Sequence, residues 1–181
     1  MTMVIKPARF NIYLCAALTL ALACGCEEFH KPKKERVVAT LSLHLEQDPD
    51  GISDIEAASI YRSAPIEISV ETQPFLDTRS LDEATLVDEP GGLFSIRLKF
   101  NWEGTAILDT ITSSNPGKRI AIFGDFKDKR WLASPMVRKR ISNGILIFTP
   151  DATHEEAERI VQGLNDVAKQ MKEDNKHQSE F

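Results

Sequence analysis

Cysteine is scarce in this sequence of 181 residues, and its three cysteines, Cys15, Cys24 and Cys26, all lie near the N-terminus. The rest of the chain therefore has no disulfide framework, no thiol nucleophile and no cysteine-based metal site. Beyond the N-terminal segment, no apolar run reaches the roughly 18–20 residues that a transmembrane helix needs. We therefore expect the remainder to fold around an ordinary apolar core.

Positive charge is also in short supply. Lysine and arginine number 22 against 27 aspartates and glutamates, which gives a formal net charge of −5. A protein that binds nucleic acid through phosphate contacts needs the opposite balance, so we expect no nucleic-acid partner. The hydrophobic share of 42% is too high for a disordered chain and is typical of a folded one. The length predicts one domain.

Motifs of the common enzyme classes are missing. The sequence has no G-x-S-x-G nucleophile motif, no P-loop, no H-E-x-x-H and no glycine-rich dinucleotide loop. His154 precedes Glu158 by one helical turn, but one histidine and one carboxylate are too few ligands for a metal site. We therefore predict that the protein is not an enzyme and that it has neither a cofactor nor a bound metal.

Residues 1–25 are arranged like a bacterial lipoprotein-type secretory signal. A basic start is followed by an almost wholly apolar stretch, and small residues precede Cys26. We predict that Cys26 becomes the lipidated N-terminus, with Cys24 as the alternative. A plain signal-peptidase cut after Ala23 and an uncleaved anchor helix are the other interpretations.

Residues 26–36 follow as a charged tether without hydrophobic periodicity, which is typical of a solvated linker. Cleavage before Cys26 would remove Lys6 and Arg9 but no acidic residue, so the formal net charge would change from −5 to −7. The mature domain is thus expected to be distinctly acidic.

Residues 37–172 predict a single α+β domain, and a polar tail follows at 173–181. We expect a mostly antiparallel sheet with two main helices packed on one face. Period-two alternation and turn signals place the strands at 37–46, 59–62, 66–70, 93–100, 119–126, 130–137, 137–141 and 145–148. On the first strand His44 falls on the polar side, where we expect it to be solvated. Ser80 is expected to cap a one-turn helix over 81–84.

The two main helices are expected at 102–113 and from Thr153 onward. Thr153 and Glu156 form a capping box at the start of the second helix. Apolar residues then recur at the helical period in one stripe, with Leu164 near its middle. This stripe predicts the face that packs on the sheet.

Between residues 100 and 165 the sequence carries short motifs in a recognisable order. They are Glu103-Gly104, Thr112 with Asn115-Pro116-Gly117-Lys118, Arg119-Ile120-Ala121-Ile122, Ala133-Ser134-Pro135, Ile141 with Gly144, Phe148-Thr149, Glu155-Glu156-Ala157 and Leu164-Asn165. In this order they resemble the head subdomain of the first periplasmic domain of SecD, a subunit of the protein-export translocase. The resemblance implies a scaffold and a link to export, without catalytic chemistry.

The sequence departs from that family in two places. The segment GDFKDKRW at 124–131 replaces a short Asp-Gly turn, and the transmembrane helices that carry the proton pathway of SecD have no counterpart. The resemblance therefore implies no proton-driven motor.

These features predict a lipid-anchored binding module on the periplasm-facing membrane surface of the cell envelope. Its expected ligand is an unfolded polypeptide or a partner from the export or envelope machinery. The alternative is a structural accessory subunit that docks on a membrane complex without binding a client. The strand 130–137, interrupted at Pro135, is the candidate binding edge, with Trp131 and Leu132 as contacts. The acidic charge favours basic or neutral segments. In the alternative interpretation, other parts of the fold cover this strand and Trp131 only packs against them.

Overall fold

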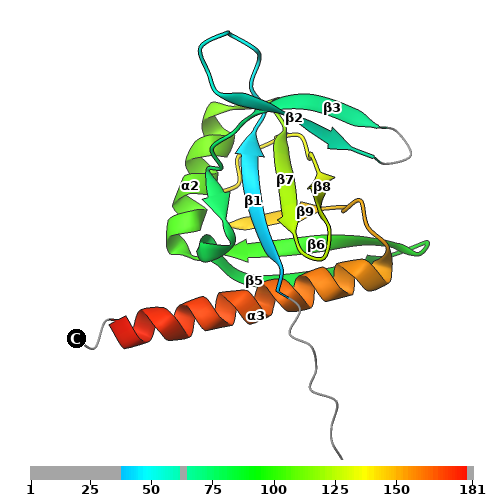
Figure 1. Cartoon of the computed structure of the whole chain (residues 1–181), viewed down its shortest axis with the longest axis vertical. Helices are drawn as coiled ribbons and strands as arrows, with labels where there is room; N and C mark the ends of the chain where they lie inside the picture. The colour runs from blue at the N-terminus through cyan, green and yellow to red at the C-terminus, as the bar shows by residue number, and fades with distance from the viewer. Residues whose placement is uncertain (1–37, 62–64, 179–181) are drawn as a thin grey trace, which may run out of the picture. The chain divides into compact units, whose positions relative to one another are not determined.

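The computed structural model describes residues 38–61 and 65–178, all within the compact unit Arg36–Phe181. The predicted signal and tether, at 1–25 and 26–36, lie outside the described residues. The fold is α+β with antiparallel strands, as predicted (Figure 1). Its elements are β1 (Thr40–Leu45), β2 (Ile55–Ile60), β3 (Ile66–Glu71), β4 (Leu76–Asp77), the 3-10 turn η2 (Thr78–Ser80), β5 (Leu81–Glu89), β6 (Leu93–Phe100), α2 (Trp102–Ser114), β7 (Ile120–Asp125), β8 (Lys129–Ala133), β9 (Ile145–Phe148) and α3 (His154–Gln178).

The strands of the described part divide among three sheets rather than one. A four-stranded sheet has the order β4-β1-β7-β8, a three-stranded sheet has the order β5-β6-β9, and β2 with β3 forms a separate ribbon. The main core takes side chains from the two larger sheets and from both helices. The two larger sheets therefore share one core, and the ribbon lies outside it.

Alternation along β1 and β7 decides which face of the four-stranded sheet is buried. Leu41 and Leu43 of β1 and Ile122 of β7 are buried in the main core. Because successive side chains of a strand point to opposite faces, Thr40 and Ser42 stand on the outer face. The predicted strand is confirmed, with its polar residues on the side away from the core.

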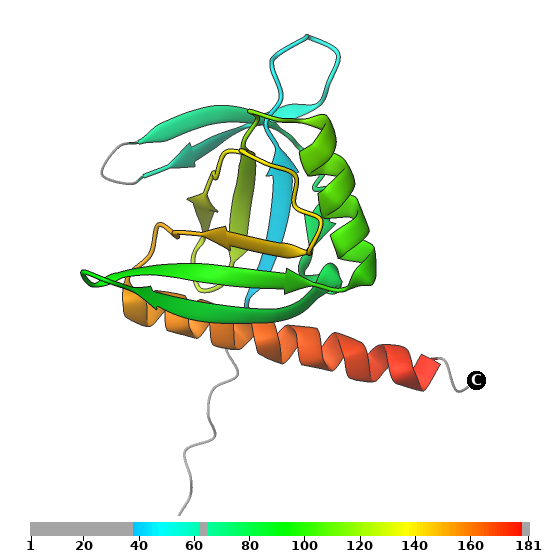
Figure 2. The ribbon, with the colours of Figure 1, turned by 180° about the vertical axis from the view of Figure 1, so that it is seen from behind.

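The strand β6 is the centre of the three-stranded sheet. Ile96, Leu98 and Phe100 are buried, whereas Lys99 is exposed. This matches the alternation predicted at 93–100, except that Ser95 on the opposite face is also buried and donates a hydrogen bond to Glu89 at 2.6 Å. The helix α3 lies along β5 at the border of this sheet (Figure 2).

The helix α3 packs through the predicted stripe, whose buried members are Ala157, Ile160, Leu164 and Ala168. Next to that stripe, the Asn165 side chain bonds the backbone N–H and C=O of Ala84 on β5, at 2.8 Å each. The helix continues to Gln178, past the end at Lys172 that the hydropathy predicted. No helix within residues 38–61 and 65–178 is long and apolar enough to span a membrane.

The helix α2 is fixed at its start by a side-chain cap and a close approach. The Asn101 side chain accepts a hydrogen bond from the Gly104 N–H at 2.8 Å. A Cβ on Gly104 would lie 2.9 Å from the Cβ of Ser80, so only glycine fits here without movement. Leu108 and Thr112 are buried one and two turns further on. The expected helix at 102–113 is confirmed.

Several local predictions were wrong. The strand predicted at 59–62 is β2, which runs from Ile55 to Ile60, and the strand predicted at 130–137 ends at Ala133. Ser80 caps no helix at 81–84, because those residues belong to β5 and pair with β6. The turn η2 is capped by Asp77 instead. Cross-strand packing outweighs a local capping signal in such cases. Residues 137–141 are not a strand, and they belong to a connecting segment, the arch (residues 134–144), which runs from β8 past α2 to β9 (Figure 2).

Candidate functional site

The outer face of the four-stranded sheet carries the candidate site. The strand register pairs Ser42 of β1 with Phe123 of β7, and Phe123 with Trp131 of β8. Residues paired across antiparallel strands lie on the same face. These side chains therefore stand together on the side opposite the core, with Thr40 and Asp125 as the next pair along.

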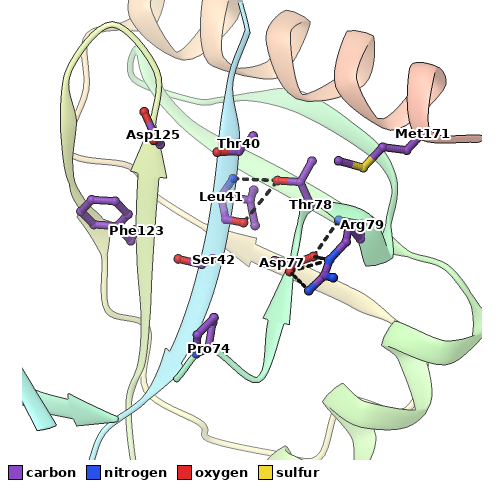
Figure 3. Close-up of a pocket in the computed structure, with 10 residues that line it drawn as sticks. All are labelled: Thr40, Leu41, Ser42, Pro74, Asp77, Thr78, Arg79, Phe123, Asp125 and Met171. Carbon is purple, nitrogen blue, oxygen red and sulfur yellow. Dashed lines mark hydrogen bonds and ion pairs between the residues drawn. The ribbon is translucent and has the colours of Figure 1, made fainter. Parts of the chain in front are cut away.

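A cavity of about 390 Å³ opens on this face (Figure 3). It is lined by Thr40, Leu41, Ser42, Pro74, Asp77, Thr78, Arg79, Phe123, Asp125 and Met171. Figure 3 shows Phe123 at one side of the cavity, while Met171 approaches from α3 at the other. Both are half-buried, as is Pro74. The cavity therefore presents apolar surface beside the polar groups of β1.

Thr78 satisfies backbone hydrogen-bonding groups of β1 at the cavity wall. Its hydroxyl accepts a hydrogen bond from the Leu41 N–H at 2.7 Å and donates one to the Leu41 C=O at 3.2 Å. The neighbouring strand β4 is two residues long, so this hydroxyl replaces the strand partner that β4 does not supply. The edge of β1 is therefore not free to pair with another chain at Leu41.

The acidic residues that line the cavity are paired. Arg79 donates to Asp77 through Nη2 at 2.6 Å and through its backbone N–H at 2.8 Å. Burial raises the pKa of Asp77, but the hydrogen bonds from Arg79 outweigh burial and hold that pKa below its ordinary value. Asp125 pairs with Lys129, whose Nζ lies 2.8 Å from Oδ2. Charge alone therefore does not direct a cation into the cavity.

Trp131 continues the apolar surface from the cavity towards the β2–β3 ribbon. Its ring packs edge to face on Phe123 and on His44, with centroids 5.2 Å apart in each case. On its far side it contacts the small cluster that includes Ala58 and Val70 of the ribbon. Trp131 is half-buried, so it both packs and reaches the outer face.

The expected solvation of His44 was wrong. His44 lies on the outer face as the alternation predicted, but only 6% of it is exposed, because the ribbon covers this end of the sheet. One ring nitrogen lies 2.8 Å from the Glu71 C=O and the other lies 2.9 Å from Ser42 Oγ. The histidine therefore anchors the ribbon on β1.

Leu132 does not share the position of Trp131. It is 1% exposed and packs in the main core, where a Cβ on Gly124 would lie 2.7 Å from its Cδ1. Its C=O accepts from the Asp151 N–H at 2.7 Å, and Arg130 bonds the Asp151 C=O at 3.0 Å. Part of the β8 edge is thus occupied by residue 151. Of the two contacts expected at this edge, only Trp131 lies on the outer face, where it packs on Phe123 beside the cavity.

The remaining sequence candidates lie elsewhere. His154 is within 3.5 Å of Glu158, and its other nitrogen is 2.8 Å from Asp88 of β5. Among the described residues, no three His, Cys, Asp or Glu side chains converge in a group able to hold a metal. Trp102 is 83% exposed at the start of α2 and does not line the cavity.

Sequence reasoning missed Phe123 and Met171 as site residues. A signal for Phe123 was present, because the run Ile120–Phe123 is apolar at every position, which is typical of a strand covered on both faces. The apolar stripe of α3 predicted which helix face Met171 lies on, but it did not predict which segments lie opposite that part of the helix. That information depends on the position of β1 and η2 in the fold.

Comparisons with known proteins agree with the resemblance seen in the motifs. Residues 56–168, which are more than half of the chain, match the protein family described as "SecDF, P1 head subdomain". The protein translocase subunit SecD of Acetobacter pasteurianus is 26% identical over 110 residues, covering 60% of this chain and 20% of that protein. This chain thus spans about one fifth of the length of that relative.

A solved structure shares the fold. The membrane component SecDF, described as enhancing protein export, matches with a TM-score of 0.52 and 19% identity. The match covers 90% of this chain and 71% of the other. At this identity the likeness concerns the fold, and it agrees with the α+β architecture described above.

Proposed function

Because the chain belongs to the SecDF P1 head subdomain family, we propose that it is a binding module of protein export that holds unfolded polypeptide at the cell envelope. Its place is the periplasm-facing membrane surface, where a lipidated Cys26, or Cys24 in its stead, anchors it. No catalytic step is part of this function. The module presents a surface to a passing segment and releases it unchanged.

The observation that carries this proposal is the apolar cavity on the outer sheet face. An unfolded segment exposes apolar side chains that a folded protein buries, and it gains free energy by removing them from water. A cavity of about 150 Å³ already admits benzene, so about 390 Å³ has room for a large apolar side chain. Phe123 and Met171 supply apolar contact, and aromatic anchors of this kind dominate binding energy at interfaces.

The polar groups of the cavity also suit a transient ligand. Thr40 and Ser42 bring hydroxyls to the cavity wall, and the acids there are paired with Arg79 and Lys129. The wall therefore has no unpaired carboxylate that would select one charge. Selection by apolar character, without a fixed sequence, is what a module for diverse unfolded chains needs.

Tryptophan fluorescence tests the proposal directly. The chain has two tryptophans, so the Trp102→Phe variant leaves Trp131 as its only tryptophan, in contact with Phe123. Titration of this variant with a reduced, unfolded model protein should change the Trp131 emission saturably at tens of micromolar. Phe123→Ala should weaken binding by about tenfold or more.

The control replaces an apolar residue far from the cavity. Ile52 is 92% exposed on another loop, so Ile52→Ala should bind as the parent does. Absence of saturable binding at tens of micromolar, or equal binding by the parent and a folded Phe123→Ala variant, contradicts the proposal.

A further inference from the structure

At one position on each of three strands in the two larger sheets, another residue of the chain bonds backbone groups that the neighbouring strand leaves free. The Asn165 side chain on α3 forms hydrogen bonds with the N–H and C=O of Ala84 on β5. The Thr78 hydroxyl forms hydrogen bonds with the N–H and C=O of Leu41 on β1. The Asp151 N–H donates to the C=O of Leu132 on β8. An open edge pairs readily with other chains, so closure of this kind protects against unspecific pairing. The outer edge of β9 differs from these.

The direction of the backbone groups along β9 follows from one hydrogen bond. The Gly144 C=O accepts from the Phe100 N–H at 2.9 Å, so Gly144 faces β6. In an antiparallel pair this direction alternates from residue to residue. The backbone N–H and C=O of Leu146 therefore also point towards β6, whereas those of Ile145 and Ile147 point away from it. The Ile145 N–H confirms this, because it donates to the Asn143 side chain at 3.1 Å instead.

Three backbone groups of β9 are consequently open. They are the N–H and C=O of Ile147 and the C=O of Ile145. Within residues 38–61 and 65–178 no hydrogen bond engages any of them. One added strand would satisfy all three without displacing a hydrogen bond of the fold.

A groove of about 470 Å³ runs along this edge, between β9 and the arch. The arch is held at both ends. The Val137 N–H donates to the Lys118 C=O at 2.8 Å, and the Val137 C=O accepts from the Gly117 N–H at 2.9 Å. Nearer to β9, the Ile141 N–H donates to Thr112 Oγ1 at 2.9 Å, and Arg140 pairs with Asp109 on α2. The groove is therefore preformed, which lowers the entropic cost of binding.

The side chains of the groove define the chemistry of an occupant. Met136 and Ile147 are 46% and 54% exposed, so they offer apolar contact. Arg138 and Lys139 are exposed, and in the described part of the chain neither forms an ion pair. The groove lining contains no aspartate or glutamate, although the chain as a whole carries a net charge of −5. This local excess of positive charge is complementary to carboxylates.

We propose that the β9 edge binds one extended, acidic strand of a partner protein by strand addition. The backbone of the partner pairs with Ile145 and Ile147, its apolar side chains contact Met136 and Ile147, and its carboxylates lie near Arg138 and Lys139. Backbone pairing supplies affinity, while the pattern of side chains supplies selectivity. This inference is independent of the cavity on the four-stranded sheet and requires no client there.

The test uses the full chain and an end-blocked hexapeptide of alternating valine and glutamate as the probe. Calorimetric titration should show saturable binding with a dissociation constant at or below about 1 mM. Binding should slow hydrogen exchange at the Ile147 amide. The same peptide with an N-methyl group on every residue keeps its side chains but cannot pair, and it should not bind. Replacing its glutamates by lysines should weaken binding by about tenfold or more.

A charge variant tests the basic residues. Arg138→Gln with Lys139→Gln should weaken probe binding by about threefold to tenfold. Lys127→Gln with Lys169→Gln removes the same charge at exposed positions elsewhere and should leave binding within about twofold.

Four outcomes overturn the inference. They are absence of binding at 1 mM, equal binding of the N-methylated peptide, and unchanged exchange at Ile147 on saturation. The fourth is a loss of binding to phosphatidylglycerol vesicles in the Arg138 and Lys139 variant while probe binding stays the same. That result would assign the basic residues to lipid. The peptide comparisons use the unaltered chain, so they decide the matter even if a variant folds poorly.

Discussion

The side-chain amide of Asn165 on α3 mimics a strand partner for Ala84 on β5. Its oxygen accepts from the Ala84 N–H and its nitrogen donates to the Ala84 C=O, each at 2.8 Å. A side-chain amide carries an acceptor oxygen and a donor nitrogen, so it can bond both backbone groups of one residue. The pair therefore satisfies the β5 edge at Ala84 and links α3 to the sheet through one residue.

We predict that Asn165→Ala lowers the free energy of unfolding by about 1–3 kcal/mol. The substitution leaves the N–H and C=O of Ala84 without a partner under α3, and unsatisfied buried groups cost about this much. Urea denaturation of both proteins measures the difference. The neighbouring Asp166 is exposed, so Asp166→Ala should stay within about 0.5 kcal/mol of the parent. Equal midpoints for the two variants would contradict the role given to Asn165.

A second prediction concerns the stripe of α3. Leu164 is 1% exposed in the main core. Leu164→Ala should therefore lower the free energy of unfolding by about 2–5 kcal/mol, through lost burial and the cavity left behind. Thermal or urea unfolding checks this value, with the exposed Lys169→Ala as control. An unchanged melting temperature would mean that the stripe does not contribute to the core.

The start of α3 shows how far a local pattern predicts a structure. Thr153 and Glu156 were expected to form a full capping box, and one half is present, since Thr153 Oγ1 accepts from the Glu156 N–H at 3.2 Å. The Glu156 carboxylate instead accepts from Arg130 of β8 at 2.8 Å. The helix start was predictable from four residues, whereas the partner of Glu156 depends on a strand 26 residues away in the sequence.

The contrast between local sequence pattern and contacts with distant segments also explains where the other predictions and the structure differ. The strands with strict alternation, β1 and β6, and the helices α2 and α3 follow from local pattern. The burial of His44 does not, because it depends on the β2–β3 ribbon, which arrives from elsewhere in the sequence. The position of Leu132 follows from the alternation of β8, which places it on the face opposite to Trp131. The cavity combines parts of five elements, so its composition was not readable from any one of them.

The pairing of Glu156 with Arg130 predicts a dependence of stability on pH. The hydrogen bond from Arg130 holds the pKa of Glu156 below its ordinary value. A carboxyl with a depressed pKa in the folded state stabilises that state above the unfolded pKa, and the contribution is lost as pH falls through the folded pKa. The unfolded value is near 4.5. The contribution is therefore present at pH 6 and declines below about pH 4.5.

Glu156→Gln removes this titration. We expect the loss of unfolding free energy between about pH 6 and pH 3 to be smaller in Glu156→Gln than in the parent. Glu173→Gln, at an exposed position of α3, should show the loss seen in the parent. Identical pH profiles for the parent and Glu156→Gln would show that the pair with Arg130 adds no pH-dependent stability.

Lipidation of Cys26, with Cys24 as the alternative, gives a prediction about location. Acyl chains contribute about 0.8 kcal/mol for each buried CH₂, and two signals are needed for stable anchoring. Cells that express the chain with both cysteines replaced by serine should release it from the membrane fraction. Single replacements identify which cysteine is used. A double variant that stays with the membranes would refute lipid anchoring and favour an uncleaved N-terminal helix.

The central claim is that the outer-face cavity holds unfolded polypeptide during export. Site-specific photocrosslinking tests it most directly, with benzoylphenylalanine placed at Phe123 and, as control, at the exposed Trp102. Cells that export a slowly folding protein should yield crosslinks to that protein from position 123 and few or none from position 102, and the crosslinks should disappear once export is complete. Equal crosslinking from both positions, or none from position 123 in a folded variant, would contradict the account.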